Sequence, residues 1–135
     1  MNVSDIASRA LLGLQKNQHY VLWNNSIWCT GKLTLQFPDV MLPLSSDILN
    51  VILPLISDTK IDNSIRENAV FVFCCLAIKD SKLLTKYINS ELVALCIQQI
   101  PKNTPPRNIS DNLSIFRGIL VMTKGKIHFN CFTVY

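Results

Sequence analysis

Charged residues are scarce in this chain. They make up 16% of its 135 residues, against 49% hydrophobic residues, a balance that is apolar for a soluble domain. The net charge is only +4, and lysines and arginines form no run of five or more. Because nucleic-acid-binding arms and patches concentrate basic residues, we expect no direct nucleic-acid partner.

Residue patterns that support metal binding or catalysis are also missing. The five cysteines show no C-x-x-C spacing, and only two histidines are present, so a zinc site is not expected. A glycine-rich phosphate loop, paired carboxylates and a Ser/His/Asp set do not stand out either. We predict that the protein is not an enzyme and uses no cofactor. Cys74 and Cys75 are interpreted as inert core thiols in a reducing compartment.

Long hydrophobic runs are absent as well. The longest uninterrupted apolar run covers residues 69–78, whereas a membrane-spanning helix needs ~20 apolar residues. The first five residues lack the basic-then-apolar order of a signal peptide. We therefore expect no membrane insertion and a location in the cytoplasm and nucleus.

The chain does show helical periodicity. Apolar residues recur at helical spacing as far as about residue 123, and strand-like alternation is confined to the last few residues. We predict a cap at Ser45 or Ser46 and another at Asp62 or Asn63. Pro54 should kink its helix or end it early. The predicted helices cover residues 3–16, 19–37, 45–56, 63–78, 82–100 (with a break near residue 89) and 107–123.

Six helices joined by short turns predict an all-α fold. A helix pair occupies ~40 residues in HEAT-type repeats, so the chain is interpreted as a HEAT-type α-solenoid fragment of about three antiparallel helix pairs. The pairs would cover residues 3–37, 43–78 and 82–123, followed by an irregular, divergent tail at 124–135. A plain helical bundle is the alternative, because periodicity does not distinguish the two.

The helix predicted at 19–37 contains a candidate peptide-binding surface. At ~100° per residue, Trp28 lies far from the expected core face, with Asn24 one turn earlier and Asn25 beside them. Carboxamides can donate to and accept from a peptide backbone, and an indole offers an apolar platform. The alternative roles are packing for the tryptophan and solvation for the amides. Trp23 is expected to pack between repeats. The expected core face comprises Leu22, Ser26, Cys29, Leu33 and Phe37.

Three segments carry a resemblance to a known family. They are NNSIWCTG at 24–31, ENA at 67–69, and RNISDN at 107–112 followed by FRGI at 116–119. In this order they resemble the C-terminal half of transportin-like receptors in the importin-β (karyopherin-β) family of nuclear import receptors. The likeness extends over roughly residues 5–122.

The resemblance implies a superhelix of HEAT repeats that carries cargo proteins into the nucleus. Transportin-like receptors bind a disordered, basic nuclear localisation signal that ends in Pro-Tyr. The paired asparagines and the tryptophan of the matching helix belong to the family's cargo surface, which implies cargo-binding roles for Asn24, Asn25 and Trp28. The resemblance also implies that the full-length receptor binds nucleoporins and the GTPase Ran, and that binding of Ran releases the cargo. The Ran surface lies in the family's N-terminal half, outside the likeness.

Other functions stay open at this point. The chain is alternatively a HEAT-type scaffold for a folded protein partner, an accessory domain of an enzyme, or a truncated product without transport activity. We also expect an end repeat to expose an apolar stripe, which favours self-association. This stripe comprises Ile109, Leu113, Phe116 and Leu120.

Overall fold

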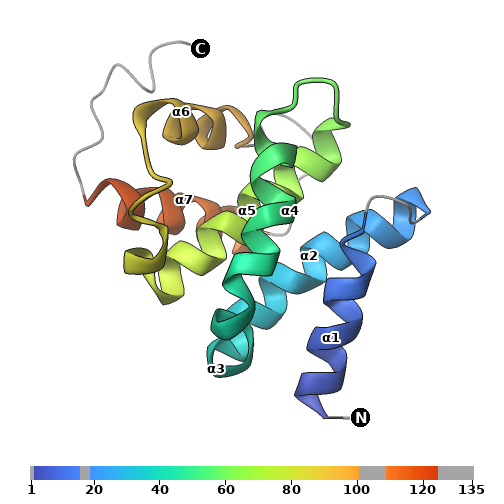
Figure 1. Cartoon of the computed structure of the whole chain (residues 1–135). Helices are drawn as coiled ribbons and strands as arrows, with labels where there is room; N and C mark the ends of the chain where they lie inside the picture. Colours follow the sequence, from blue (N-terminus) through green and yellow to red (C-terminus); the bar gives the residue numbers. More distant parts are fainter. Residues whose placement is uncertain (1, 16–18, 101–108, 125–135) are drawn as a thin grey trace.

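The computed structural model describes residues 2–15, 19–100 and 109–124, and within these ranges it contains helices and turns but no strand (Figure 1). The predicted all-α class is therefore confirmed for the described residues. The segment 101–106, between the last two predicted helices, lies outside them, as does the tail beyond Lys124. The helices are α1 (Val3–Gly13), α2 (Tyr20–Gln36), α3 (Pro38–Met41), η1 (Leu42–Leu44), α4 (Ser45–Ser57), α5 (Asn63–Lys79), η2 (Ser81–Leu84), α6 (Ser90–Gln98) and α7 (Ile109–Thr123).

Several helices begin at side-chain caps that the local sequence supplies, α5 and α6 among them. Asp62 Oδ1 accepts the backbone N–H of Ser64 at 2.9 Å and starts α5, as predicted. Asn89 Oδ1 accepts the N–H of Leu92 at 2.8 Å and starts α6, which confirms the predicted break near residue 89. Such caps satisfy backbone donors that the first helical turn leaves unpaired.

The start and end of α4 differ from the predictions. Neither Ser45 nor Ser46 caps the helix, because α4 begins at Ser45 and its N-cap residue, Leu44, makes no side-chain cap. The 3-10 helix η1 leads directly into α4, and the Ser45 N–H bonds to the carbonyl of Leu42. Pro54 lies inside α4, which continues to Ser57. The helix therefore does not end early at Pro54.

The stretch Pro38–Ser57, which joins α3, η1 and α4, is long and apolar enough to cross a membrane by length and composition alone. It spans 20 residues, which differs from the expectation based on uninterrupted apolar runs. The core helix of a soluble protein meets the same criterion. In this fold Ile48, Ile52 and Ile56 are fully buried, whereas Asp47 is exposed.

The helices pack in a regular order. α2 packs against α5, and α5 packs against α7, so these three form a central row (Figure 1). α1 packs on α2, α4 on α5 and α6 on α7. Helix α5 thus has α2 and α7 as neighbours within the row, and α4 packs on a further side of it.

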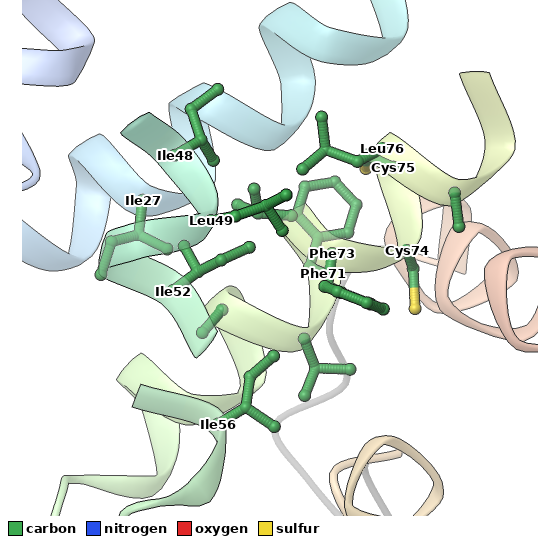
Figure 2. Packing of buried hydrophobic residues seen from close by; sticks show 14 of the residues in the cluster. Ile27, Ile48, Leu49, Ile52, Ile56, Phe71, Phe73, Cys74, Cys75 and Leu76 are labelled. Carbon is green, nitrogen blue, oxygen red and sulfur yellow. The ribbon is translucent and has the colours of Figure 1, made fainter. Parts of the chain in front are cut away.

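This position buries α5 almost completely. An apolar stripe at helical spacing along α5 is fully buried, and so are Val70, Phe71, Cys74 and Cys75 on its other sides (Figure 2). Removing this much apolar surface from water is the main stabilising contribution to such a fold. The buried stripe comprises Ile65, Ala69, Val72, Phe73 and Leu76.

Glycines allow α5 to approach both neighbours in the row. A Cβ built on Gly31 of α2 would lie 2.5 Å from Cε1 of the Phe71 ring. A Cβ on Gly118 of α7 would lie 2.6 Å from the Cα of Cys74. Both separations are shorter than a carbon–carbon van der Waals contact of about 3.5–4.0 Å. A larger residue would therefore displace the Phe71 ring at Gly31 and would press on the backbone of α5 at Gly118.

The buried face of α2 is broader than predicted and is centred elsewhere. Leu22 and Phe37 are exposed, although both were assigned to the core face, whereas Ile27 and Thr30 are fully buried. Trp23 is also buried, at 8% exposure, which agrees with its predicted packing role. The predicted core face was one stripe, with separate packing expected at Trp23, and α2 has neighbours in both α1 and α5. Polar threonines enter the core because each hydroxyl bonds a carbonyl one turn earlier, as Thr30 does to Ser26 at 2.8 Å.

Candidate functional site

One ridge of α2 carries most of the polar contacts between the helices of the central row. Tyr20, Asn24, Trp28 and Lys32 follow one another at intervals of four residues, so they lie on one side of the helix. We call these four residues the α2 ridge. Its members contact polar side chains near the N-terminal ends of α5 and α7.

Tyr20 forms the first contact of the ridge. Its hydroxyl donates to Asp62 Oδ1 at 2.8 Å, the same oxygen that caps α5. This hydrogen bond raises the pKa of Tyr20 above its ordinary value of 10.0, with smaller contributions from desolvation and from the negative charge of Asp62.

Asn24 is half-buried, and its carboxamide bonds to α5. Its Nδ2 donates to Ser64 Oγ at 3.2 Å, and its Oδ1 accepts from Asn68 Nδ2 at 2.6 Å. A carboxamide has two N–H donors and two acceptor lone pairs. The contacts to Ser64 and Asn68 therefore use one donor and one lone pair of Asn24, which leaves one of each for a ligand.

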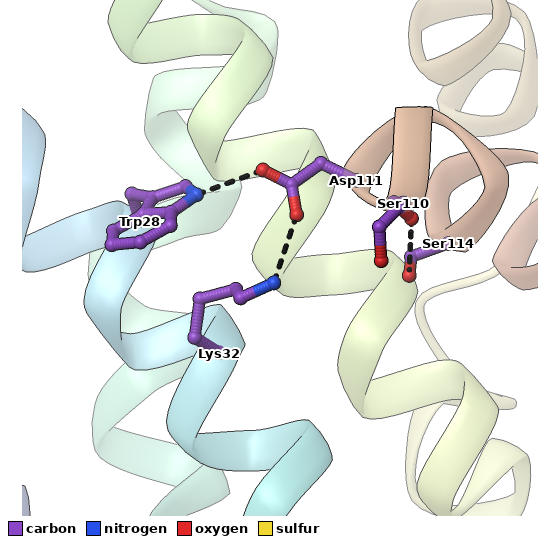
Figure 3. A network of polar contacts seen from close by, with 5 residues as sticks. All are labelled: Trp28, Lys32, Ser110, Asp111 and Ser114. Carbon is purple, nitrogen blue, oxygen red and sulfur yellow. Dashed lines mark hydrogen bonds and ion pairs between the residues drawn. The ribbon is translucent and has the colours of Figure 1, made fainter. Parts of the chain in front are cut away.

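Trp28 contacts α7 and keeps much of its ring in solvent. Its Nε1 donates to Asp111 Oδ2 at 2.9 Å, while 40% of the residue is exposed (Figure 3). The ring is therefore held in place by one edge, and an apolar surface remains accessible. This arrangement agrees with the predicted off-core position of Trp28.

Lys32 completes a three-residue cluster with Trp28 and Asp111. Its Nζ lies 3.1 Å from Asp111 Oδ1 and 5.8 Å from the centre of the Trp28 ring. The Asp111 side chain is 5% exposed and that of Lys32 is 33% exposed. A buried carboxylate requires a partner for its charge, and here it has both an indole N–H and an ammonium group. We call these three residues the cation cluster.

Asn25 lies apart from the other two predicted site residues. It lines an open groove of about 310 Å³ between α1 and α2, together with Ile6, Arg9 and Leu22. The ~100° step between successive helical residues separates it from Asn24. The structure thus places Asn24 and Trp28 on one ridge and does not bring Asn25 to it.

Two residues of the cation cluster were not identified from the sequence. Lys32 stands four residues after Trp28, and this spacing is a usable signal, because side chains four apart on a helix are neighbours. Asp111 is 83 residues from Trp28 in the chain. Its segment was noted in the resemblance, but nothing local in the sequence pairs it with α2.

The chemistry of the described residues is that of packing and polar contacts. Among them no group of three or more His, Cys, Asp or Glu side chains is placed to hold a metal ion. Cys74 and Cys75 are fully buried, as expected for core thiols. The contact with Cys96 and burial raise the pKa of the Cys74 thiol well above 9.0, which keeps it in its unreactive protonated form.

Comparisons with models of known protein families, with curated proteins and with solved structures found no match for this chain.

Proposed function

We propose that this chain binds an extended, basic peptide along the α2 ridge, as a fragment of a HEAT-type nuclear import receptor. The observation that carries the proposal is the cation cluster, where an ammonium group lies beside an exposed indole and a buried carboxylate. A lysine or arginine of a ligand would be stabilised by the same two groups.

The polar groups next to the cluster suit the backbone of such a peptide. Asn24 lies one turn from Trp28 and retains a free donor and a free lone pair after its contacts to Ser64 and Asn68. An extended peptide has unpaired N–H and C=O groups, which amide side chains can satisfy. The ridge therefore offers backbone contacts and a side-chain site within one helical turn of each other.

Local charge also supports a basic ligand. The whole chain carries a net charge of +4, but among the described residues two carboxylates, Asp62 and Asp111, contact the ridge, which itself carries the ammonium of Lys32. Electrostatic complementarity favours association of a negatively charged surface with a basic partner.

The packing order of the helices supports the receptor part of the proposal. A central row with an outer helix on each member is what stacked HEAT pairs would form, and such stacks present one line of helices to a ligand. The proposed partners are cargo proteins that bear a basic nuclear localisation signal ending in Pro-Tyr. Ran and nucleoporins would be partners of the full-length receptor, which would operate in the cytoplasm and nucleus.

A fluorescence anisotropy titration tests this function. The full chain is titrated against a labelled basic peptide that ends in Pro-Tyr. We expect Trp28→Ala to weaken binding by about 30-fold, the size of a central hot-spot residue. Asn24→Ala tests the backbone contacts of the ridge, and Asn25→Ala is its matched control. Asn25→Ala should change the dissociation constant less than about twofold because Asn25 lies off the ridge.

The peptide also needs its own control. Replacing its arginines by citrulline removes their charge while keeping their length, and this should abolish most of the binding. A chain that unfolds cooperatively but binds neither peptide would contradict the proposed function.

The exposed apolar face of α7 favours a second function, a scaffold for a folded protein partner. Ile109 and Leu113 are 74% and 62% exposed, and Phe116 and Leu120 continue the same stripe. Contiguous apolar surface of this kind is typical of protein interfaces. A partner that binds Trp28→Ala normally but does not bind Leu113→Lys would identify this function in place of peptide binding.

A further inference from the structure

We propose that Lys32 is an internal competitor that occupies the cation cluster and excludes lysine side chains of a ligand more effectively than arginine side chains. The inference rests on the proposed function, because it concerns how the same ridge selects its peptide. In the structure the position that a ligand cation would take is filled by the chain's own ammonium group (Figure 3).

The cluster has room for one cation at its carboxylate. Asp111 Oδ2 accepts the indole N–H of Trp28 at 2.9 Å, and Oδ1 lies 3.1 Å from the Nζ of Lys32. Because only 5% of the Asp111 side chain is exposed, solvent offers almost no other approach to it. A ligand cation must therefore take the place of Lys32 to reach the carboxylate.

Lys32 is placed so that it can leave. Its side chain is 33% exposed, and it ends in a compact ammonium on a flexible stem, which water solvates well once it swings out. The buried carboxylate of Asp111 needs a cation beside it, and a ligand cation would meet this need in place of Lys32. The competition is therefore close enough for a ligand to win.

The ammonium of a lysine and the guanidinium of an arginine would make different contacts in the cation cluster. The ammonium lies 5.8 Å from the centre of the Trp28 ring, near the outer limit for a cation–π contact. A guanidinium is planar, and it can stack on an indole while it bonds a carboxylate. Lys32 is thus expected to exclude lysine side chains more effectively than arginine side chains.

An NMR titration of the full chain isolates the cluster from the rest of the peptide site. The chain has two tryptophans, so its ¹⁵N spectrum has two indole signals, which Trp28→Phe assigns. The probe is N-acetyl-arginine amide. Lys32→Met should bind this probe about tenfold more tightly than the parent chain, as expected when a competing ion pair is removed. The shift should appear at Trp28, whereas the signal of buried Trp23 should stay in place.

Two further variants test the cause. Lys32→Arg keeps a cation in the cluster and should bind the probe no more tightly than the parent. The double variant Lys32→Met with Asp111→Asn removes the carboxylate charge and should lose the gain in affinity for the probe. Equal affinity of the parent chain and Lys32→Met for the probe would overturn the proposal.

The remaining outcomes separate this inference from the proposed function. If Lys32→Met binds the probe but no variant binds the Pro-Tyr peptide, the internal competition stands and the peptide function fails. If Lys32→Met does not fold, the uncharged Lys32→Gln replaces it. If neither variant folds, Lys32 is a structural partner of Asp111 and the proposal is overturned.

Discussion

Helices α5 and α7 both carry an apolar stripe at helical spacing, yet one stripe is buried and the other is exposed to solvent. The stripe of α5 is fully buried, from Ile65 to Leu76. The stripe of α7 points to solvent, and its members Phe116 and Leu120 are 43% and 55% exposed. The exposure expected for the α7 stripe is thereby confirmed.

The difference comes from the neighbours of each helix. α5 packs against α2, α7 and α4, whereas in the described part of the chain α7 packs against α5 and more lightly against α6. The opposite face of α7 is buried, including Ile115 and Ile119, so the helix still contributes to the core. Position in the central row, and not the apolar pattern, decides whether a stripe is covered.

The largest expected effect on stability comes from a pair of phenylalanine truncations, one in each helix. Phe71→Ala in α5 removes a fully buried ring and should lower the free energy of unfolding by about 3–5 kcal/mol. Phe116→Ala in α7 removes a ring that is 43% exposed and should cost less than about 1 kcal/mol. Urea denaturation followed by circular dichroism measures both. Equal losses would show that the α7 stripe is covered in solution.

The next effect concerns the close approach of α7 to α5. The added methyl group of Gly118→Ala would lie 2.6 Å from the backbone Cα of Cys74, which cannot rotate away. We expect a loss of about 1–3 kcal/mol from overpacking. At an exposed helical site the same change would gain up to about 1 kcal/mol. Thermal unfolding with Ser114→Ala as a control on the same helix gives the sign, and a stabilised Gly118→Ala would contradict the packing.

Self-association is a further test of the exposed stripe. Leu113→Lys places a charge in the middle of the stripe and should shift the chain toward the monomer in sedimentation velocity runs at increasing concentration. Ser114→Lys adds the same charge at the next residue and serves as the control. Identical sedimentation of the parent, Leu113→Lys and Ser114→Lys would mean that the stripe does not mediate association.

The smallest expected effect is at the edge of the row, where Tyr20 donates to Asp62. Tyr20→Phe should cost about 0.5 kcal/mol at neutral pH, the low end for an exposed hydrogen bond. The folded-state pKa of Tyr20 is raised above 10.0, so its contribution is complete below pH 10 and is lost as pH rises through the raised pKa. The urea midpoints of the two proteins should therefore differ at neutral pH and converge once the pH exceeds the raised pKa of Tyr20. A difference that stays constant with pH would contradict this assignment.

Local sequence allowed the helices themselves to be predicted well. α2 runs from Tyr20 to Gln36, against a predicted 19–37, and Asp62 caps α5 as expected. Both features depend on hydrogen bonds between residues a few positions apart, which sequence patterns record directly. The error at Ser45 arose because η1 continues into α4 and takes over the role of a cap.

The candidate site could be predicted only in part. Trp28 and Asn24 were correctly placed on one side of a helix, because four-residue spacing fixes that relation. The polar partners were not found, since Asn68 and Asp111 lie 44 and 83 residues further along the chain. Asn25 was grouped with them because it is adjacent in sequence, although adjacent residues on a helix point in different directions.

The sequence by itself determined that the chain is helical, where most helices begin, and which residues share a helical face. These properties follow from backbone hydrogen bonds and side-chain periodicity within one or two turns. The tertiary structure alone decided that the stripe of α5 is buried and that of α7 exposed, and that Lys32 and Trp28 meet Asp111. Burial and polar pairing depend on which helices become neighbours, and that is set by the summed packing of the whole chain.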